Sequence, residues 1–347
     1  MEFKSPCSLV RGGTSKALFF HPQDLPSDFK LREKFILSAL GSPDSKQING
    51  VGSGSVHSSK AAIISKSNQP NCDIDYDFMT VLINEPKIEY SATCGNILSA
   101  VAPFAINEGL VTPNHPITKV RIYSVNMQIT VTAYVPTKEN GLFNPEGTFH
   151  IDGVPSSGSK IDLEFTNCNE IFPTGNKQDS VNIDGKILQV TLVKGIAPTV
   201  IVKGKDVGID PNCDINSLKN DSNLLQYLEK VRQTAGKLIG DEVVNYLPKI
   251  SVVFPPINGG HIRGFMLSLG KQHASFAVSC SIPTTYASKV AGAVAHEVAK
   301  PADNRVILEH PSGSIEVKLA IEGEELTSAT VARTAKILMK GEVYGFI

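Results

Sequence analysis

Short apolar segments rich in β-branched residues recur along the chain, and Gly, Pro, Asn or Asp bound most of them. This pattern is typical of strands. We predict strands at 61–64, 120–123, 129–135, 187–193 and 199–202. Helical periodicity predicts helices at 31–40, 97–107, 224–238, 286–298 and 330–339. Strands in hairpin-like runs with few helices among them indicate an α+β fold.

One group of elements occurs twice. The first copy is Cys94, a helix, a break at 109–116 and a strand pair at 120–123 and 129–135. The second copy is Cys280, a helix, a break at 300–304 and a strand pair at 306–309 and 315–321. The spacing between the copies is longer than the period of solenoid repeats. We therefore expect two similar domains, with a boundary at 137–141, where Pro, Lys, Glu, Asn and Gly cluster.

Length and charge narrow the class of protein. A chain of 347 residues is long enough for two domains. A formal charge of -1 provides no basic field for nucleic acid, and no apolar stretch approaches the roughly 20 residues that span a bilayer. Residues 1–11 carry charges where a signal peptide would be apolar. We expect a soluble, cytoplasmic protein that acts on a small molecule, and a two-fold homodimer is the expected assembly.

Cysteine and histidine spacing argues against disulfides and metals. The six cysteines are dispersed without CxxC pairs, at positions Cys7, Cys72, Cys94, Cys168, Cys213 and Cys280. This spacing favours free thiols. His296-Glu297 resembles the start of a zinc motif, but Lys300 stands where the second histidine should be. We predict no metal.

The first candidate site is Arg11-Gly12-Gly13-Thr14-Ser15-Lys16. Paired glycines let a backbone approach a ligand closely, and an arginine offers a fork for a carboxylate. Arg11, Thr14 and Ser15 are therefore candidate substrate-binding residues. A plain turn before a strand is the alternative interpretation of the same hexapeptide.

Lys60 follows a glycine- and serine-rich segment. Its glycines, at 50–54, follow a polar stretch and lead into a strand, so they do not fit a dinucleotide loop. A substrate loop fits better, with Ser58 and Ser59 as donors to carboxylate oxygens. Lys60 stands just before apolar strand residues, where desolvation would lower its pKa and free the amine to act as a base. A surface lysine is the alternative.

Two cysteines are associated with predicted helices. A helix start leaves N–H groups unpaired and carries a partial positive charge, so it favours a thiolate and attracts carboxylates. Cys94 is such a candidate, with Gly95 keeping the approach open and Asn96 offering an amide. Cys280 is a weaker one, because Pro283 delays the predicted helix and Ser279 is an equally suitable contact. A buried, inert thiol is the alternative for either cysteine.

Several motifs together resemble one family. They are Arg11–Lys16, Gly41-Ser42-Pro43-Asp44, Ser59-Lys60, Cys94-Gly95-Asn96, Phe172-Pro173-Thr174-Gly175-Asn176, His310-Pro311-Ser312-Gly313 and Gly341-Glu342-Val343-Tyr344. In this order, over nearly the whole chain, they resemble the methylaconitate isomerase (PrpF) family. That resemblance implies a diaminopimelate epimerase-like fold: two similar α+β domains, each a curved antiparallel sheet around a central helix, with the active site between them. It implies domains at 1–139 with 336–347, and at 140–335.

The resemblance also implies a chemistry. The family isomerises unsaturated tricarboxylates such as aconitate, methylaconitate and oxalomesaconate without a cofactor. Lys60 and Cys94 match its catalytic lysine and cysteine. Loop positions on a rigid scaffold often contact ligands, and the expected binding residues in the second half are Thr174, Asn176, Ser279, Cys280, Ser312 and Gly313.

Two other functions stay open. Unlike the Cys-Gly pairs of the epimerases, Cys280 is followed by Ser281, which argues against a racemase that uses two thiols. A tricarboxylate-binding protein without catalysis is the other alternative. The isomerase hypothesis requires a base that removes an allylic proton and an acid that returns one, with Lys60 and Cys94 in these two roles in either order.

Overall fold

The computed structural model describes residues 1–90, 93–166, 172–240 and 247–347. The chain forms two compact units, one of residues 1–164 with 332–347 and the other of residues 165–331. The first unit continues past the expected boundary at 137–141, because this stretch folds back through bridges from Thr137 to Phe143 and from Phe149 to Gly158. Among the described residues, no helix is long and apolar enough to cross a membrane.

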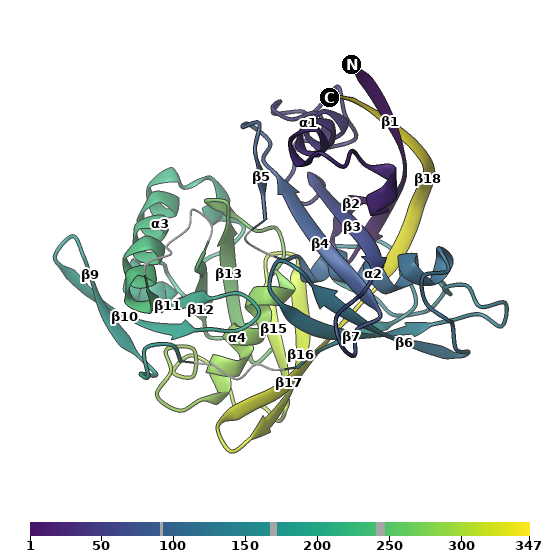
Figure 1. The fold of residues 1–347 in the computed structure, drawn as a ribbon. Coiled ribbons are helices and arrows are strands. Elements are labelled where there is room, and N and C mark those ends of the chain that lie inside the picture. The colour runs from purple at the N-terminus through teal and green to yellow at the C-terminus, as the bar shows by residue number, and fades with distance from the viewer. Residues whose placement is uncertain (91–92, 167–171, 241–246) are drawn as a thin grey trace. The chain divides into compact units, whose positions relative to one another are not determined.

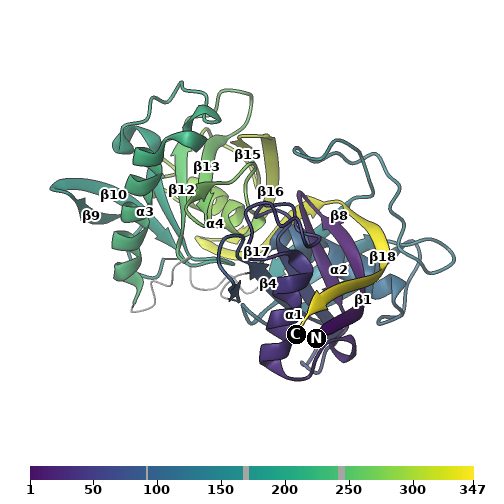
Figure 2. The same cartoon turned by 90° about the horizontal axis from the view of Figure 1, so that it is seen from above.

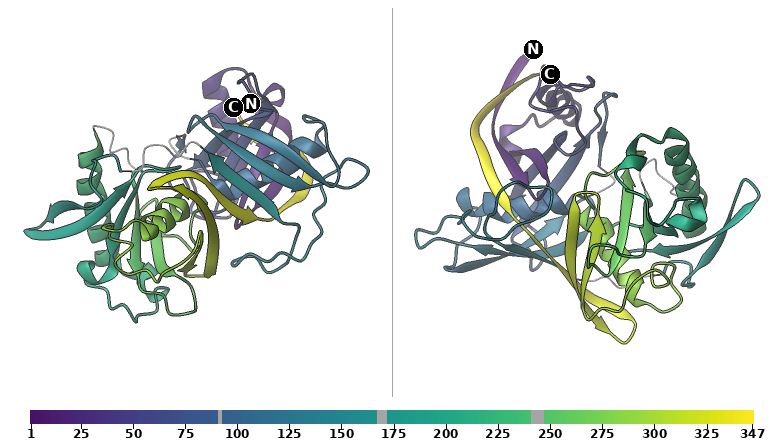
Figure 3. Two further views of the ribbon diagram at one scale, coloured as in Figure 1. Left: turned by 90° about the horizontal axis from the view of Figure 1, so that it is seen from below. Right: turned by 180° about the vertical axis from the view of Figure 1, so that it is seen from behind.

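The first unit contains both ends of the chain. Its elements are β1 (Glu2–Gly12), β2 (Ser15–Phe20), η1 (Pro22–Asp24), α1 (Phe29–Leu40), β3 (Lys60–Lys66), β4 (Ile74–Val81), β5 (Ile88–Glu89), α2 (Gly95–Asn107), β6 (Ile117–Ser124), β7 (Ile129–Pro136), the start of β8 (Ile161–Thr166) and β18 (Ala335–Phe346). The strand order is β18-β1-β2-β3-β4-β6-β7. Figures 1 and 3 show β18 in yellow beside β1 in purple, and the backbone nitrogen of Met1 donates to the Ile347 carbonyl at 3.1 Å.

The second unit is one continuous segment. Its elements are β9 (Asp179–Ile183), β10 (Lys186–Val193), β11 (Thr199–Lys203), η2 (Gly204–Val207), η3 (Ser217–Asn220), α3 (Ser222–Gly236), η4 (Lys237–Ile239), β12 (Lys249–Phe254), β13 (Ile262–Ser268), β14 (Lys271–Gln272), α4 (Val278–Lys289), β15 (Arg305–His310), β16 (Gly313–Glu322) and β17 (Glu325–Arg333). The strand order is β9-β10-β11-β12-β13-β15-β16-β17.

The two units have the same topology. From β18 to β7, and from β9 to β16, successive strands pair antiparallel, antiparallel, parallel, antiparallel, parallel and antiparallel. Each parallel pair needs a crossover, and α1 and α2 in the first unit correspond to α3 and α4 in the second. The prediction of two similar α+β domains is therefore confirmed, with two parallel pairs in each mainly antiparallel sheet.

Each sheet has one helix on its outer face and a central helix on its inner face. In the first unit α1 packs on Leu18, Ala61, Ile63 and Met79, while every residue of α2 from Gly95 to Ile106 is buried. In the second unit α3 packs on Val202, Val252 and Phe265, and α4 packs on the opposite face, where Thr284 hydrogen-bonds to Ser251. Figure 2 shows α3 and α4 on either side of β12 and β13.

Two predicted helices are wrong. The helix expected at 286–298 begins eight residues earlier, at Val278, and ends at Lys289. Pro283 lies inside it, and Gly292, with a φ of +91°, follows in the turns after its end. The helix expected at 330–339 is instead the end of β17 and the start of β18. Pairing of β18 along the length of β1 overrides the helical propensity of this segment.

Candidate active site

Lys60 is the first residue of β3, and strand alternation sets its direction. Ala61 and Ile63 point into the core under α1, so Lys60 and Ala62 point to the opposite face, toward α2. The side chain is only 8% exposed, and its Nζ lies 5.4 Å from the centre of the Phe78 ring on β4. Burial lowers the pKa of Lys60, and the nearby Cys94 opposes that shift. The amine is thus easier to deprotonate than a surface lysine.

Hydrogen bonds of its polar groups hold the loop before β3 in place. Ser59 Oγ donates to the Val81 carbonyl at 2.8 Å and accepts from Gln47 Nε2 at 2.7 Å. Ser58 Oγ lies 2.5 Å from Ser53 Oγ. A Cβ atom on Gly52 would lie 2.2 Å from Gln47 Oε1, which gives this glycine a packing role. The two serine hydroxyls hold the loop that positions Lys60; their contact with substrate stays a prediction.

Cys94 is the N-cap residue of α2 and is partly exposed. Its side chain forms no capping hydrogen bond among the residues that the structure describes. Cys94 lies close enough to Lys60, Tyr76 and Arg333 to influence the pKa of each. Tyr76 is fully buried on β4, and burial raises its pKa well above the usual value. Lysine, thiol, phenol and guanidinium therefore surround the start of α2.

The glycine pair of the first motif packs against α2. A Cβ atom on Gly12 would lie 2.3 Å from the Asn96 carbonyl oxygen, and one on Gly13 would lie 2.1 Å from Asn96 Oδ1. The Asn96 amide donates to Thr14 Oγ1 at 3.2 Å. Only glycines allow this turn to come so close to the helix start, so the motif brings Thr14 and Asn96 together.

Arg11 and Ser15 support the same turn. Arg11 donates through one nitrogen to the carbonyls of Gly13 and Thr334, both at 2.9 Å. Burial lowers the pKa of this guanidinium. Ser15 is buried at the start of β2. These contacts give Arg11 a structural role in the turn, and its predicted contact with a carboxylate stays a prediction.

Arg333 is a site residue that the sequence reasoning missed. It is 8% exposed and donates from Nε to Asn96 Oδ1 at 3.1 Å. Along β17, Ala329, Val331 and Arg333 are buried while the residues between them are partly exposed. An arginine at a buried position of such an alternating strand is the signal that would have found it.

The remaining candidates belong to the second unit. Ser279 and Cys280 are in the first turn of α4, and Cys280 is fully buried. Burial raises the pKa of its thiol. Thr174 and Asn176 both donate to the Asp179 carboxylate, at 2.7 and 2.9 Å.

The turn after β15 carries the last two candidates. Ser312 donates to the Ala274 carbonyl, and its backbone N–H donates to His310 Nδ1 at 3.2 Å. Gly313 has a φ of +132°, which disfavours any other residue there.

Five of the predicted free cysteines are confirmed as free thiols: Cys7, Cys72, Cys94, Cys213 and Cys280. Cys168 lies outside the described residues. Glu297, of the incomplete zinc motif, pairs with Lys203 at 2.6 Å. No cluster of three or more metal-binding side chains occurs in the described part of the chain.

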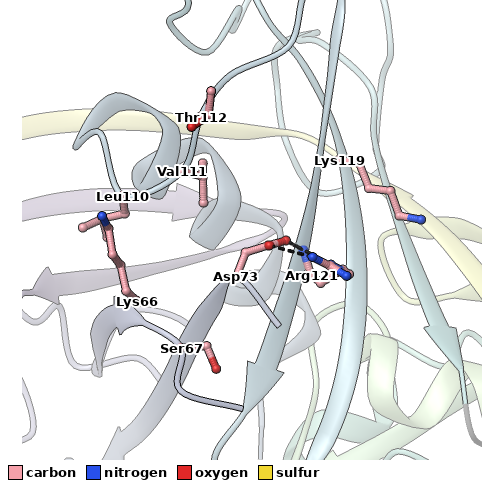
Figure 4. Close-up of a pocket in the computed structure, with 8 residues that line it drawn as sticks. All are labelled: Lys66, Ser67, Asp73, Leu110, Val111, Thr112, Lys119 and Arg121. Carbon is pink, nitrogen blue, oxygen red and sulfur yellow. Dashed lines mark hydrogen bonds and ion pairs between the residues drawn. The ribbon is translucent and has the colours of Figure 1, made fainter. Parts of the chain in front are cut away.

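A separate pocket in the first unit lies outside this cluster. It has a volume of about 530 Å³, and Lys66, Asp73, Lys119 and Arg121 are among its lining residues (Figure 4). The Asp73 carboxylate accepts from the Arg121 guanidinium at 3.0 and 3.3 Å. The charge of Arg121 is therefore already balanced, and we place the candidate site at the start of α2 instead.

Comparisons with known proteins show the family of this chain. The family model described as "PrpF protein" matches residues 2–345. The 4-oxalomesaconate tautomerase of Pseudomonas putida is 34% identical, over 99% of this chain and 96% of the relative. The (4E)-oxalomesaconate Delta-isomerase of a Novosphingobium species is 36% identical, over 98% and 97%. The crystal structure of a methylitaconate-delta-isomerase is 30% identical with a TM-score of 0.83, over 99% of this chain and 96% of that one. The chain belongs to the PrpF family.

Proposed function

We propose that the protein is a cofactor-independent isomerase that shifts a proton across an allylic di- or tricarboxylate. One group removes a proton from a carbon next to the double bond, which leaves a delocalised carbanion. A second group returns a proton at the other end of the allylic system, so the double bond moves and the composition does not change. Both groups must lie within reach of one small ligand.

The observation that carries this proposal is the pairing of Lys60 with Cys94. Lys60 is buried with a lowered pKa, and Cys94, partly exposed, lies close enough to affect it. A neutral amine and a thiol, or an ammonium and a thiolate, are one base and one acid in either protonation state. Either arrangement supplies both steps of the reaction.

The start of α2 supports binding of the anionic substrate. Helix N–H groups near Cys94 and Gly95 favour negative charge. The Asn96 side chain is held by Thr14 and Arg333 and does not need to reorganise as charge spreads over the substrate. Fixed donors of this kind stabilise a carbanion better than mobile water.

The state of Cys280 disfavours a racemase that uses two thiols. Such an enzyme needs a second thiol that exchanges protons with its substrate. Cys280 has no exposed surface, and burial raises its pKa. The lysine–cysteine pair of the first unit is therefore the better acid–base pair.

The relatives suggest the substrate class. Two are named for oxalomesaconate, and the solved structure is titled for methylitaconate. These acids share a carbon–carbon double bond beside carboxylates. We propose that this chain acts on an acid of the same class, with aconitate and methylaconitate as further members to test.

The test is proton exchange in heavy water. The protein is incubated with each of the four acids, and deuterium uptake and isomer formation are followed by NMR. We expect uptake at an allylic carbon together with formation of the isomer. Tight binding without any exchange would favour the non-catalytic alternative, and the absence of both with all four acids would refute the proposal.

Matched variants assign the two roles. Lys60→Met and Cys94→Ser should each lower the isomerisation rate by about 1000-fold or more, since acid–base groups contribute roughly 10²–10⁴-fold. The controls are Lys66→Met, at the exposed end of the same strand, and Cys72→Ser. The variant that still exchanges substrate hydrogen without forming the isomer retains the base.

A further inference from the structure

Five cationic side chains are buried in the described part of the chain, namely Lys60, Lys203, Arg232, Arg263 and Arg333. A buried charge is costly unless something compensates it. The partners of these five side chains therefore show which buried positive charges are compensated by other groups of the protein.

Three of the five lie in the second unit and have partners there. Lys203 pairs with Glu297 at 2.6 Å and with Asp206 at 3.3 Å. Arg232 pairs with Glu229 at 2.5 Å. Arg263 donates to the carbonyls of Pro211 and Cys213 and lies over the Phe254 ring.

Lys60 and Arg333 are the two buried cations of the first unit. Neither has a carboxylate partner among the described residues, and both lie near Cys94. Arg333 uses Nε for the Asn96 amide and Nη1 for the Ala332 carbonyl at 2.9 Å. Its Nη2 has no hydrogen-bond partner within the described part of the chain. One edge of a buried guanidinium is thus available beside the proposed acid–base pair.

We propose that Arg333 binds one carboxylate of the substrate through this edge and thereby selects acids that carry a carboxylate beside the reacting carbons. This inference rests on the proposed function and names the residue that recognises the substrate class. Arginine suits the role because its fork matches a carboxylate. Burial lowers the pKa of Arg333 to about 10, so the group remains charged at neutral pH.

The contact with Asn96 fixes the direction of the guanidinium. Asn96 Oδ1 accepts from Arg333 while its amide donates to Thr14. Asn96 is the second residue of α2. A carboxylate at Nη2 would therefore lie near the positive end of this helix, next to Cys94 at its N-cap.

The test compares two variants on two kinds of substrate. The substrates are the acid that the wild-type protein exchanges fastest and the monoamides of that acid, each of which lacks one negative charge. For the full acid, Arg333→Met should raise KM or lower kcat/KM by about 10- to 100-fold, because a hydrogen bond between charged groups is lost. Arg333→Lys should recover part of this loss.

The decisive measurement is the discrimination between acid and monoamide. The wild-type protein should prefer the acid to one of its monoamides by about 10-fold or more, and Arg333→Met should lose that preference. If the variant slows acid and monoamides equally, Arg333 has only a structural role and the inference is wrong. If the wild-type protein exchanges none of the four acids, the proposed function itself fails.

Controls separate binding from folding. Arg305→Met removes an exposed arginine that pairs with Glu316, and it should change neither KM nor the preference. Thermal unfolding shows whether Arg333→Met is folded. A readout without catalysis is alkylation of Cys94 by iodoacetamide: the acid should protect the wild-type thiol at about 10-fold lower concentration than it protects the thiol of Arg333→Met. Equal protection would contradict the inference.

Discussion

Asn96 lies so close to Gly13 that a Cβ atom on the glycine would be 2.1 Å from Asn96 Oδ1. Gly13 also has a φ of +50°, where other residues are strained. We predict that Gly13→Ala lowers the free energy of unfolding by roughly 2–4 kcal/mol, from backbone strain and from displaced hydrogen bonds of Asn96. The isomerisation rate should fall by about 10-fold or more, because Asn96 no longer holds its position.

Gly109→Ala is the matched control for this substitution. Gly109 has a φ of +68°, and a Cβ atom there would meet nothing within 4 Å. This variant carries the backbone strain alone, roughly 1–2 kcal/mol, and should keep full activity. Equal rates for both variants, measured beside urea unfolding, would show that the Gly13–Asn96 contact does not matter to the site.

Lys60 should be required for activity and unfavourable for stability. Its lowered pKa, caused first by burial, means that the folded state penalises the charged amine. Lys60→Met should therefore lower the isomerisation rate by about 1000-fold or more and raise the free energy of unfolding by about 1–2 kcal/mol at pH 7. The gain should shrink as the pH rises toward 10.5, because the wild-type amine then becomes neutral in the folded state. Denaturant unfolding at pH 7 and at pH 10 measures this gain in the free energy of unfolding, with Lys66→Met as control.

His57 predicts how the protein responds to acid. Burial, and then the charge of Lys60, lower the pKa of His57 from 6.5 to about 4. Between these two values the unfolded chain binds a proton that the folded chain does not, so this contribution to stability is complete above pH 6.5 and is lost as the pH falls toward 4. From pH 7 to pH 4 the wild-type protein should lose roughly 2–3 kcal/mol more stability than His57→Gln. His150→Gln, at an exposed position, is the control variant.

Cys94 and Cys280 should differ strongly toward alkylating reagents. Cys94 is partly exposed, whereas Cys280 is fully buried with a raised pKa. Iodoacetamide at pH 8 should modify Cys94 at least about 100-fold faster than Cys280, as measured by peptide mass spectrometry. Cys7, buried with a pKa raised to about 11, provides an internal reference. A comparable rate at Cys280 would reopen the possibility of a two-thiol mechanism.

The sequence predicts the fold well where a pattern is local. The helices expected at 31–40 and 224–238 correspond to α1 and α3 within two residues, because both have a polar and an apolar face and an aspartate at the N-cap. The helix α4 is buried all round and has no such face. Its extent therefore depends on the sheet around it, which a local pattern does not contain.

The same distinction applies to the site. The neighbours of Lys60 and Cys94 in the sequence are sufficient to nominate both residues. The role of Gly12 and Gly13 depends on Asn96, more than 80 residues away, because both glycines pack against it. Arg333 joins Asn96 across 237 positions, a contact that no motif contains.

The first unit takes β1 and β18 from opposite ends of the chain, and Arg333 and Thr334 lie just before β18. During translation, the nascent polypeptide has all of residues 165–331 before it reaches these residues. The second unit can thus fold on the ribosome before β18, the edge strand of the first unit, has been synthesised. The contacts of Arg333 with Asn96 and of Thr334 with Gly13 accordingly form only after residues 333 and 334 have left the exit tunnel.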